Sequence, residues 1–175
     1  MRQVLFGHDT GFPPAIESVK QQSITYLNEE ALNDLYEQVR RAESEKLPGA
    51  LIEAGCALGG SAIVMATAKS KARAFYIYDV FEMIPPPSGI DGKDVHKRYE
   101  DIKLGKSEGI DGKQYYGYKE NLMDEVTKNF YTHGLELESN SIFLIRGLFQ
   151  NTLQINQDVA IAHIDGDWYE SVKTC

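Results

Sequence analysis

The sequence is poor in cysteine and has no long apolar stretch. Its two cysteines, Cys56 and Cys175, stand in unrelated contexts, so the sequence suggests neither a disulfide framework nor a cysteine-rich zinc site. No apolar run approaches the roughly 20 residues that a membrane-spanning helix needs, and the N-terminus lacks the apolar core of a signal peptide. We therefore expect a soluble, cytoplasmic protein with no membrane partner.

Basic residues are also scarce, since 18 lysines and arginines stand against 26 aspartates and glutamates, a net charge of −8. This balance argues against nucleic acid as a partner, because nucleic-acid binding needs a broad basic surface. The hydrophobic fraction of 42% excludes intrinsic disorder, and 15 glycines with 6 prolines exclude a collagen-like chain. A length of 175 residues fits one domain.

Short apolar runs alternate with helical patterns along most of the chain. The pattern predicts strands at 50–55, 74–79, 141–146 and 158–164, and helices at 28–45, 61–71, 120–133 and from 168 onward. A strand, a glycine turn, a helix and a second strand make a βαβ unit, which is typical of a parallel sheet with helices on both faces. We expect a Rossmann-like, doubly wound, mostly parallel α/β fold whose C-terminal strands are missing from this chain.

Two segments depart from this rhythm. Residues 1–27 show little periodicity, and we interpret them as an N-terminal arm ahead of a domain at 28–175. Residues 83–117 contain three consecutive prolines and carry the pentapeptide Gly-Ile-Asp-Gly-Lys twice, at 89–93 and 109–113. A long insertion in a compact domain is typical of a lid, although a solvated surface excursion is an equal alternative.

The first candidate site is a glycine-rich turn that begins at Glu53 and includes Gly55, Gly59 and Ser61. Its spacing is G-x-x-x-G-G, which matches neither the dinucleotide-binding fingerprint nor a phosphate-cradling loop. Glycine at such a turn lets a ligand approach the backbone closely. The carboxylate of Glu53 opposes a pyrophosphate but favours a ligand that carries an ammonium group. The alternative is a purely structural turn.

A second acid follows at the end of the next predicted strand. Asp79 lies 24 residues after Gly55, a position from which a carboxylate can accept both ribose hydroxyls of a nucleoside. Together with Glu53, it suits S-adenosylmethionine better than a nicotinamide cofactor. The alternative is that Asp79 caps a loop.

A pair of acids, Asp165 and Asp167, follows the last predicted strand. Open parallel sheets bind ligands at the carboxyl ends of their strands, and two carboxylates there can hold a divalent cation or act as a general base. The alternative for Asp167 is a cap on the helix that begins at Trp168.

Four segments together resemble the macrocin O-methyltransferase family. They read EAGCALGG at 53–60, DVFEMIP at 79–85, GLFQNTL at 147–153 and IDGDWYES at 164–171. The resemblance implies a class I methyltransferase that transfers the methyl group of S-adenosylmethionine to a hydroxyl, typically of a sugar, on a small natural product. It also implies magnesium bound by Asp165 and Asp167, with Asp167 taking the acceptor's proton. The family's later Asp-Asp pair has no counterpart, so we expect this chain to be truncated at its C-terminus.

The resemblance implies a donor site made of Glu53, Gly55, Gly59, Ser61, Asp79 and Gly147, the last near the adenine. A small molecule with a hydroxyl group is the expected partner, and a homo-oligomer is compatible with the arm and the incomplete sheet. The rival function is a non-catalytic nucleoside-binding or assembly module on a degenerate methyltransferase fold. The glycine spacing disfavours a nicotinamide-dependent reductase.

Overall fold

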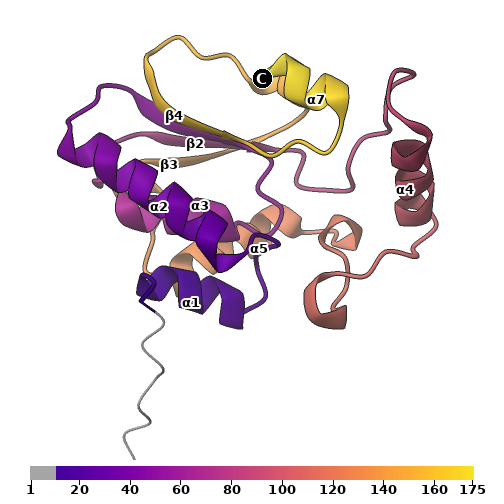
Figure 1. The fold of residues 1–175 in the computed structure, drawn as a ribbon, viewed down its shortest axis with the longest axis horizontal. Coiled ribbons are helices and arrows are strands. Elements are labelled where there is room, and N and C mark those ends of the chain that lie inside the picture. The colour runs from indigo at the N-terminus through magenta and orange to yellow at the C-terminus, as the bar shows by residue number, and fades with distance from the viewer. Residues whose placement is uncertain (1–10) are drawn as a thin grey trace, which may run out of the picture.

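The computed structural model describes residues 11–175, which form an α/β fold around a four-stranded parallel sheet (Figure 1). The strands are β1 (Ala50–Ala54), β2 (Phe75–Asp79), β3 (Ile142–Arg146) and β4 (Val159–Ile164). The helices are α1 (Pro14–Gln21), α2 (Glu29–Ser44), α3 (Gly60–Ala68), α4 (Lys93–Lys103), α5 (Leu122–Thr132), α6 (Phe149–Thr152) and α7 (Tyr169–Thr174). The predicted α/β fold with a parallel sheet and all four predicted strands are confirmed.

The strand order in the sheet is β3-β2-β1-β4. Because all pairings are parallel, the four strands end at the same edge, which brings together the segments that follow Ala54, Asp79, Arg146 and Ile164. Consecutive strands β1 and β2 are joined by α3, whose eight buried residues explain why its sequence is apolar on all sides.

Helices α1, α2, α3 and α5 lie on one side of the sheet and α7 on the other (Figure 1). The main core fills the first side and includes Leu51, Phe75 and Ile77 from the sheet. On the second side Tyr76 stacks on Phe143 with ring centroids 5.1 Å apart. Phe143 stays 45% exposed, so the second side is less completely covered.

The segment predicted as an N-terminal arm contributes to the core. Helix α1 starts with Pro14 at its first position, and its Ile16 and Val19 are completely buried in the cluster that also contains α3. Sequence periodicity did not reveal this helix, because eight residues with two buried positions give little pattern. The part of the arm at residues 1–10 lies outside the described residues.

Local capping signals place the next helix correctly. Asn28 precedes α2, and its Oδ1 accepts a hydrogen bond of 2.8 Å from the Ala31 N–H, as the predicted cap requires. In the part of the chain that the structure describes, no helix is long and apolar enough to span a membrane.

The 83–117 segment contains α4 and a short 3₁₀ turn at Ile110–Gly112, and α4 stands apart from the sheet (Figure 1). A small apolar cluster holds it, formed by Ile84, Ile102, Tyr115 and Trp168. Trp168 belongs to the end of the chain, so this cluster joins the insertion to the segment that follows β4.

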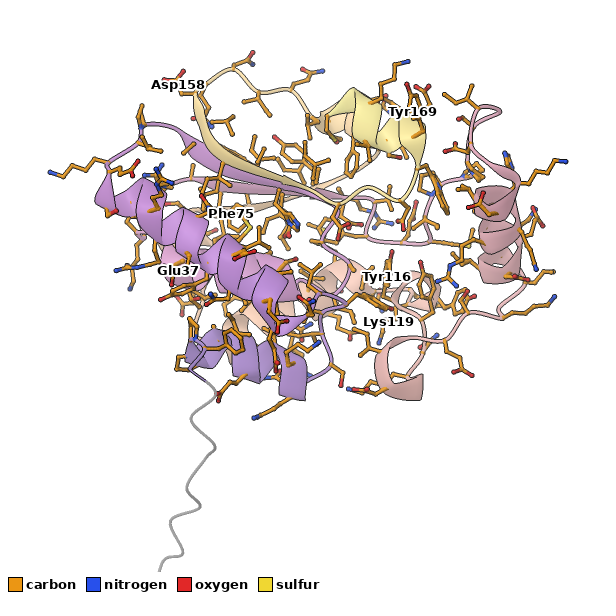
Figure 2. All side chains as sticks on the ribbon, viewed as in Figure 1. Glu37, Phe75, Tyr116, Lys119, Asp158 and Tyr169 are labelled. Carbon is orange, nitrogen blue, oxygen red and sulfur yellow. The ribbon has the colours of Figure 1, made fainter. Side chains whose placement is uncertain are left out.

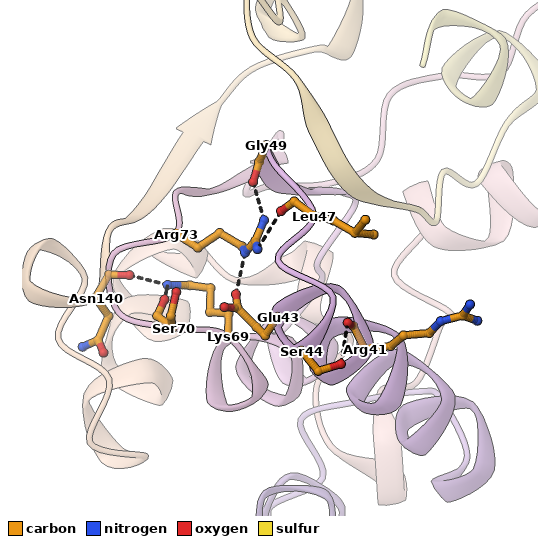
Figure 3. Close-up of polar contacts among 9 residues, drawn as sticks. All are labelled: Arg41, Glu43, Ser44, Leu47, Gly49, Lys69, Ser70, Arg73 and Asn140. Carbon is orange, nitrogen blue, oxygen red and sulfur yellow. Dashed lines mark hydrogen bonds and ion pairs between the residues drawn. The ribbon is translucent and has the colours of Figure 1, made fainter.

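A polar cluster fastens the amino ends of three strands (Figure 3). The Arg73 guanidinium donates to Glu43 Oε1, to the Leu47 carbonyl and to the Gly49 carbonyl, and its side chain is only 10% exposed. Lys69 Nζ donates to the carbonyls of Asn140 and Ser70. These bonds hold the turns that lead into β1, β2 and β3.

We expect Arg73→Ala to lower the free energy of unfolding by about 2–4 kcal/mol, because it leaves a partly buried carboxylate and two carbonyls without their donor. Urea denaturation followed by circular dichroism measures the change. Arg41→Ala is the matched control, since Arg41 makes only an exposed ion pair with Glu45 and its loss should leave the urea midpoint unchanged. Equal midpoints for the two variants would contradict the structural role of Arg73.

Candidate active site

A pocket of about 550 Å³ opens at the carboxyl edge of the sheet. Its walls are the glycine turn after β1, the end of β2, the loop after β4, residues 24–27 and parts of the 83–117 segment. Parallel α/β sheets bind ligands at this edge, so the topology and the pocket agree on the position of the site.

Gly55 lies where β1 turns toward α3, with φ at +90°. Its N–H donates to the Tyr78 carbonyl at 2.8 Å, and a Cβ at this position would lie 2.4 Å from the Asp165 carbonyl oxygen. Gly55 lines the pocket, but the close neighbour that excludes a side chain is the Asp165 backbone. The glycine therefore brings the β4 loop and its acids against the turn.

Gly59 and Gly60 serve packing. Gly59, with φ at +87°, precedes α3, and a Cβ there would lie 3.1 Å from Val126 Cγ1 of α5. Gly60 donates its N–H to the Ile24 carbonyl at 3.1 Å, and a Cβ there would clash with the same oxygen. Gly59 is not among the pocket-lining residues, whereas Gly60 and Ser61 are.

Asp79 holds the loops at the ends of β1 and β2. Its Oδ2 accepts from the N–H groups of Cys56 at 2.8 Å and Ala57 at 3.2 Å, and its Oδ1 accepts from Phe81 at 2.7 Å. Burial raises the pKa of Asp79, and these N–H groups oppose that rise. The predicted loop-capping role is thus observed, and Asp79 also lines the pocket.

Asp165 and Asp167 both line the pocket. Partial burial raises the pKa of Asp167, the carboxylates of Asp165 and Asp79 raise it further, and Arg98 opposes the rise. Asp167 does not cap α7, so that alternative was wrong: Asp91 Oδ1 accepts the Tyr169 N–H at 3.0 Å instead. Asp167 is free to face the pocket as a carboxylate of increased basicity.

The sequence profile of the macrocin-O-methyltransferase family, described as TylF, matches residues 17–175. The chain belongs to the macrocin O-methyltransferase family. No curated protein sequence matches it significantly.

Two solved methyltransferases are similar to this family member. The O-methyltransferase NovP superposes with a TM-score of 0.67 and 24% identity, over 85% of this chain and 58% of NovP. The calicheamicin methyltransferase CalS11 superposes with a TM-score of 0.54 and 15% identity, over 91% of this chain and 69% of CalS11. These likenesses show the methyltransferase fold, and the chain spans 58% of the length of NovP.

In the present member of the macrocin O-methyltransferase family, Glu53 lies behind the pocket wall. Its side chain is completely buried, and its Oε1 bonds to Nδ1 of His163, its neighbour across β1 and β4, at 2.9 Å. Burial raises the pKa of Glu53, while His163 and Ser61 lower it. Oε2 has no hydrogen-bond partner among the described residues. The sequence offered no signal for the role of His163, because the pair forms only across strands.

Gly147 also lies beside the pocket rather than in its wall. It has φ at +146° and donates its N–H to the Asp79 carbonyl at 2.9 Å, which joins β3 to the end of β2. Gly147 lines a neighbouring groove, whereas residues 148–150 line the pocket itself.

Aromatic side chains that the predicted site did not include form another wall. Tyr26 and Tyr116 meet edge to face with ring centroids 6.0 Å apart, and Tyr115 lies 4.5 Å from Tyr116. Figure 2 shows Tyr116 between the body of the protein and α4. Burial raises the pKa of Tyr115 to about 12, so its hydroxyl stays neutral. The site predicted from the sequence included none of these tyrosines, because Tyr26 meets Tyr116 only through the tertiary fold.

The residues present do not make a complete magnesium site. Across residues 11–175, no group of three or more histidines, cysteines, aspartates or glutamates is arranged to hold a metal ion. Asp165 and Asp167 line the pocket together, but Asp79 is occupied by backbone N–H groups. Two carboxylates leave most of the six positions around magnesium to other ligands.

Proposed function

We propose that the protein is an S-adenosylmethionine-dependent O-methyltransferase that methylates a hydroxyl, typically of a sugar, on a small natural product. The observation that carries this proposal is the convergence of the glycine turn, Asp79 and the acids Asp165 and Asp167 on one pocket, in a chain of the macrocin O-methyltransferase family. A nucleoside and an acceptor would then meet at one edge of the sheet.

The donor half of the pocket is the turn after β1 together with Asp79. Gly55 and Ser61 line it directly, whereas Glu53 and Gly59 act by shaping the turn. Asp79 lines the pocket while it holds the N–H groups of Cys56, Ala57 and Phe81, so it would shape the ribose end of the donor site and accept at most one ribose hydroxyl. Gly147 would act near the adenine by placing residues 148–150 at the pocket.

The methyl group on a sulfonium is already activated when the donor is bound, so this chain must position the acceptor and remove one proton. Asp167 is the base that the geometry favours, because it lines the pocket and its pKa is raised toward the range useful for proton transfer. The tyrosine wall formed by Tyr26, Tyr115 and Tyr116 would limit the access of water.

Binding of S-adenosylhomocysteine tests the donor site. We expect isothermal titration calorimetry to detect binding to the wild-type chain, and Asp79→Ala to weaken it about ten- to a hundredfold through loss of a charged hydrogen-bond acceptor and its loop contacts. The thermal midpoint of Asp79→Ala separates lost binding from lost folding. Tighter binding of NAD than of S-adenosylhomocysteine would contradict the proposal.

Magnesium enters the proposal only through Asp165 and Asp167, and no catalytic step is assigned to it. We expect this chain to bind magnesium with a dissociation constant weaker than about 1 mM, because two carboxylates compensate poorly for dehydration of the ion. Titration with magnesium chloride, with and without S-adenosylhomocysteine, measures the constant. Micromolar affinity that survives Asp165→Ala would show that other residues hold the ion.

The rival function, a nucleoside-binding module without catalysis, is favoured by one observation: among the described residues, no group of three or more histidines, cysteines, aspartates or glutamates is arranged to hold a metal ion. Both functions predict binding of S-adenosylhomocysteine. Methyl transfer from labelled S-adenosylmethionine to a panel of hydroxylated glycosides separates them, since only the enzyme labels an acceptor.

A further inference from the structure

The repeated pentapeptide Gly-Ile-Asp-Gly-Lys occurs at both ends of the part of the 83–117 segment that contains α4. Its two copies differ in backbone conformation. Gly92 has a φ of −66° and precedes α4, whereas Asp111 and Gly112 have φ values of +54° and +71° in a tight turn. The repeat is therefore not a duplicated structural unit. In both copies, the aspartate side chain accepts a hydrogen bond from a residue outside the 83–117 segment.

Asp91, from the first copy, bonds to the segment after β4. Its Oδ1 accepts the N–H of Tyr169, the first residue of α7, at 3.0 Å, and its Oδ2 accepts from the N–H and Oγ of Ser88 at 2.7 Å each. These bonds lower the pKa of Asp91, with the Tyr169 N–H contributing most. Beside them, Trp168 Nε1 donates to the Pro85 carbonyl at 2.7 Å. Trp168 directly follows Asp167.

Asp111, from the second copy, bonds to the opposite wall. Its Oδ2 accepts the hydroxyl of Ser23, and Lys113 Nζ donates to the Gln22 carbonyl at 3.0 Å. Ser23 leads into residues 24–27, which line the pocket. The Ile24 carbonyl in turn accepts the N–H of Gly60 in the glycine turn. The second copy is therefore connected, through residues 22–24, to the glycine turn after β1.

We propose that Asp91 and Asp111 are positioning residues that clasp the 83–117 segment across the pocket as a lid. The hydrogen bond from Tyr169 to Asp91, here called the Asp91 clasp, would fix the loop that carries Asp167. The hydrogen bond from Ser23 to Asp111, the Asp111 clasp, would fix residues 24–27 against the glycine turn. This proposal rests on the proposed function for its catalytic consequences only. The physical clasp concerns the unliganded protein, because both aspartates bond to groups of the chain itself.

Two measurements without ligand test the clasps separately. Trp168 is the sole tryptophan of the sequence and is 7% exposed, so acrylamide quenching of its fluorescence reports directly on the Asp91 clasp. Hydrogen exchange followed by mass spectrometry reports on both clasps. Asp101→Ala is the matched control, since Asp101 lies in the same segment and its ion pair with Lys106 stays within it.

We expect Asp91→Ala to increase Trp168 quenching and to speed exchange about five- to tenfold in residues 83–92 and 166–171. Asp111→Ala should speed exchange in residues 105–118 and 22–27 and leave Trp168 quenching unchanged. Asp101→Ala should change neither signal. Unchanged exchange and quenching in Asp91→Ala, or unchanged exchange in Asp111→Ala, would overturn the proposal for that residue.

Kinetics distinguish positioning from a merely structural role. In the methyl-transfer assay, Asp91→Ala should lower kcat with little change in KM for S-adenosylmethionine, because it loosens the Asp167 loop. Asp111→Ala should raise that KM about tenfold with kcat nearly preserved. Equal effects of both variants on both constants would overturn the division of roles. If the wild-type chain binds no S-adenosylhomocysteine, the proposed function fails while the exchange result still decides the clasps.

Discussion

Asp167→Asn is expected to lower the rate of methyl transfer by about 100- to 10,000-fold, the usual contribution of a positioned general base. Asparagine keeps the shape of the side chain but cannot take a proton from the acceptor hydroxyl. Single-turnover transfer from labelled S-adenosylmethionine, with the best glycoside of the panel, measures the loss. The affinity for S-adenosylhomocysteine should change less than about twofold, because the donor contacts lie on the turn and Asp79.

The pH dependence of methyl transfer is a second test of Asp167 as the general base. In the proposed role of general base, Asp167 acts only when ionised, and burial with its acidic neighbours raises its pKa. The rate should therefore fall as pH drops through that raised pKa, which places the acid limb of the profile above the ordinary aspartate value of about 3.9. Asp101→Asn, with the same charge change in an exposed pair, should keep the wild-type rate and profile. Full activity in Asp167→Asn would identify another base.

Local signals in the sequence were sufficient for much of the fold. Apolar runs located β1 to β4, and the Asn28 cap located the start of α2, because these features depend on neighbours within a few residues. Helix α1 was missed, since its burial depends on contacts with α3 that its own eight residues do not encode.

The candidate site was predictable to the extent that parallel topology determines it. Gly55, Asp165 and Asp167 follow strand ends and Asp79 is the last residue of β2, so the four had to meet at one edge of the sheet, and all of them line the pocket. The partners of each residue were not predictable. The contact of Glu53 with His163 depends on long-range register, as do the N–H groups that bind Asp79.

The repeated pentapeptide Gly-Ile-Asp-Gly-Lys is a further case in which structure was not predictable from local sequence. Its two copies are identical in sequence, yet Gly112 has a positive φ and Gly92 does not. Their surroundings decide the difference, because the second copy closes a hairpin in which Glu108 pairs with Gln114, whereas the first leads into α4. Five residues do not determine a backbone conformation when tertiary contacts differ.

Gly55→Ala is expected to abolish detectable binding of S-adenosylhomocysteine and to lower the free energy of unfolding by at least about 3 kcal/mol. The new methyl group would lie 2.4 Å from the Asp165 carbonyl oxygen, and the positive φ would add strain of its own. Either the turn or the β4 loop must move, and both are walls of the pocket. Calorimetry measures the binding, and urea denaturation measures the stability.

Gly134→Ala is a control that separates backbone strain at a positive φ from a steric clash of the new methyl group. Gly134 has a φ of +73°, similar to the +90° of Gly55, but a Cβ there would have no neighbour within 4 Å. This control should lose only about 1–2 kcal/mol from the unfavourable conformation and should bind S-adenosylhomocysteine like the wild type. If the two variants lose the same stability and both keep the ligand, contact between the turn and the Asp165 backbone does not shape the pocket. If Gly55→Ala alone loses the ligand, that contact holds the glycine turn and the acids Asp165 and Asp167 within reach of each other.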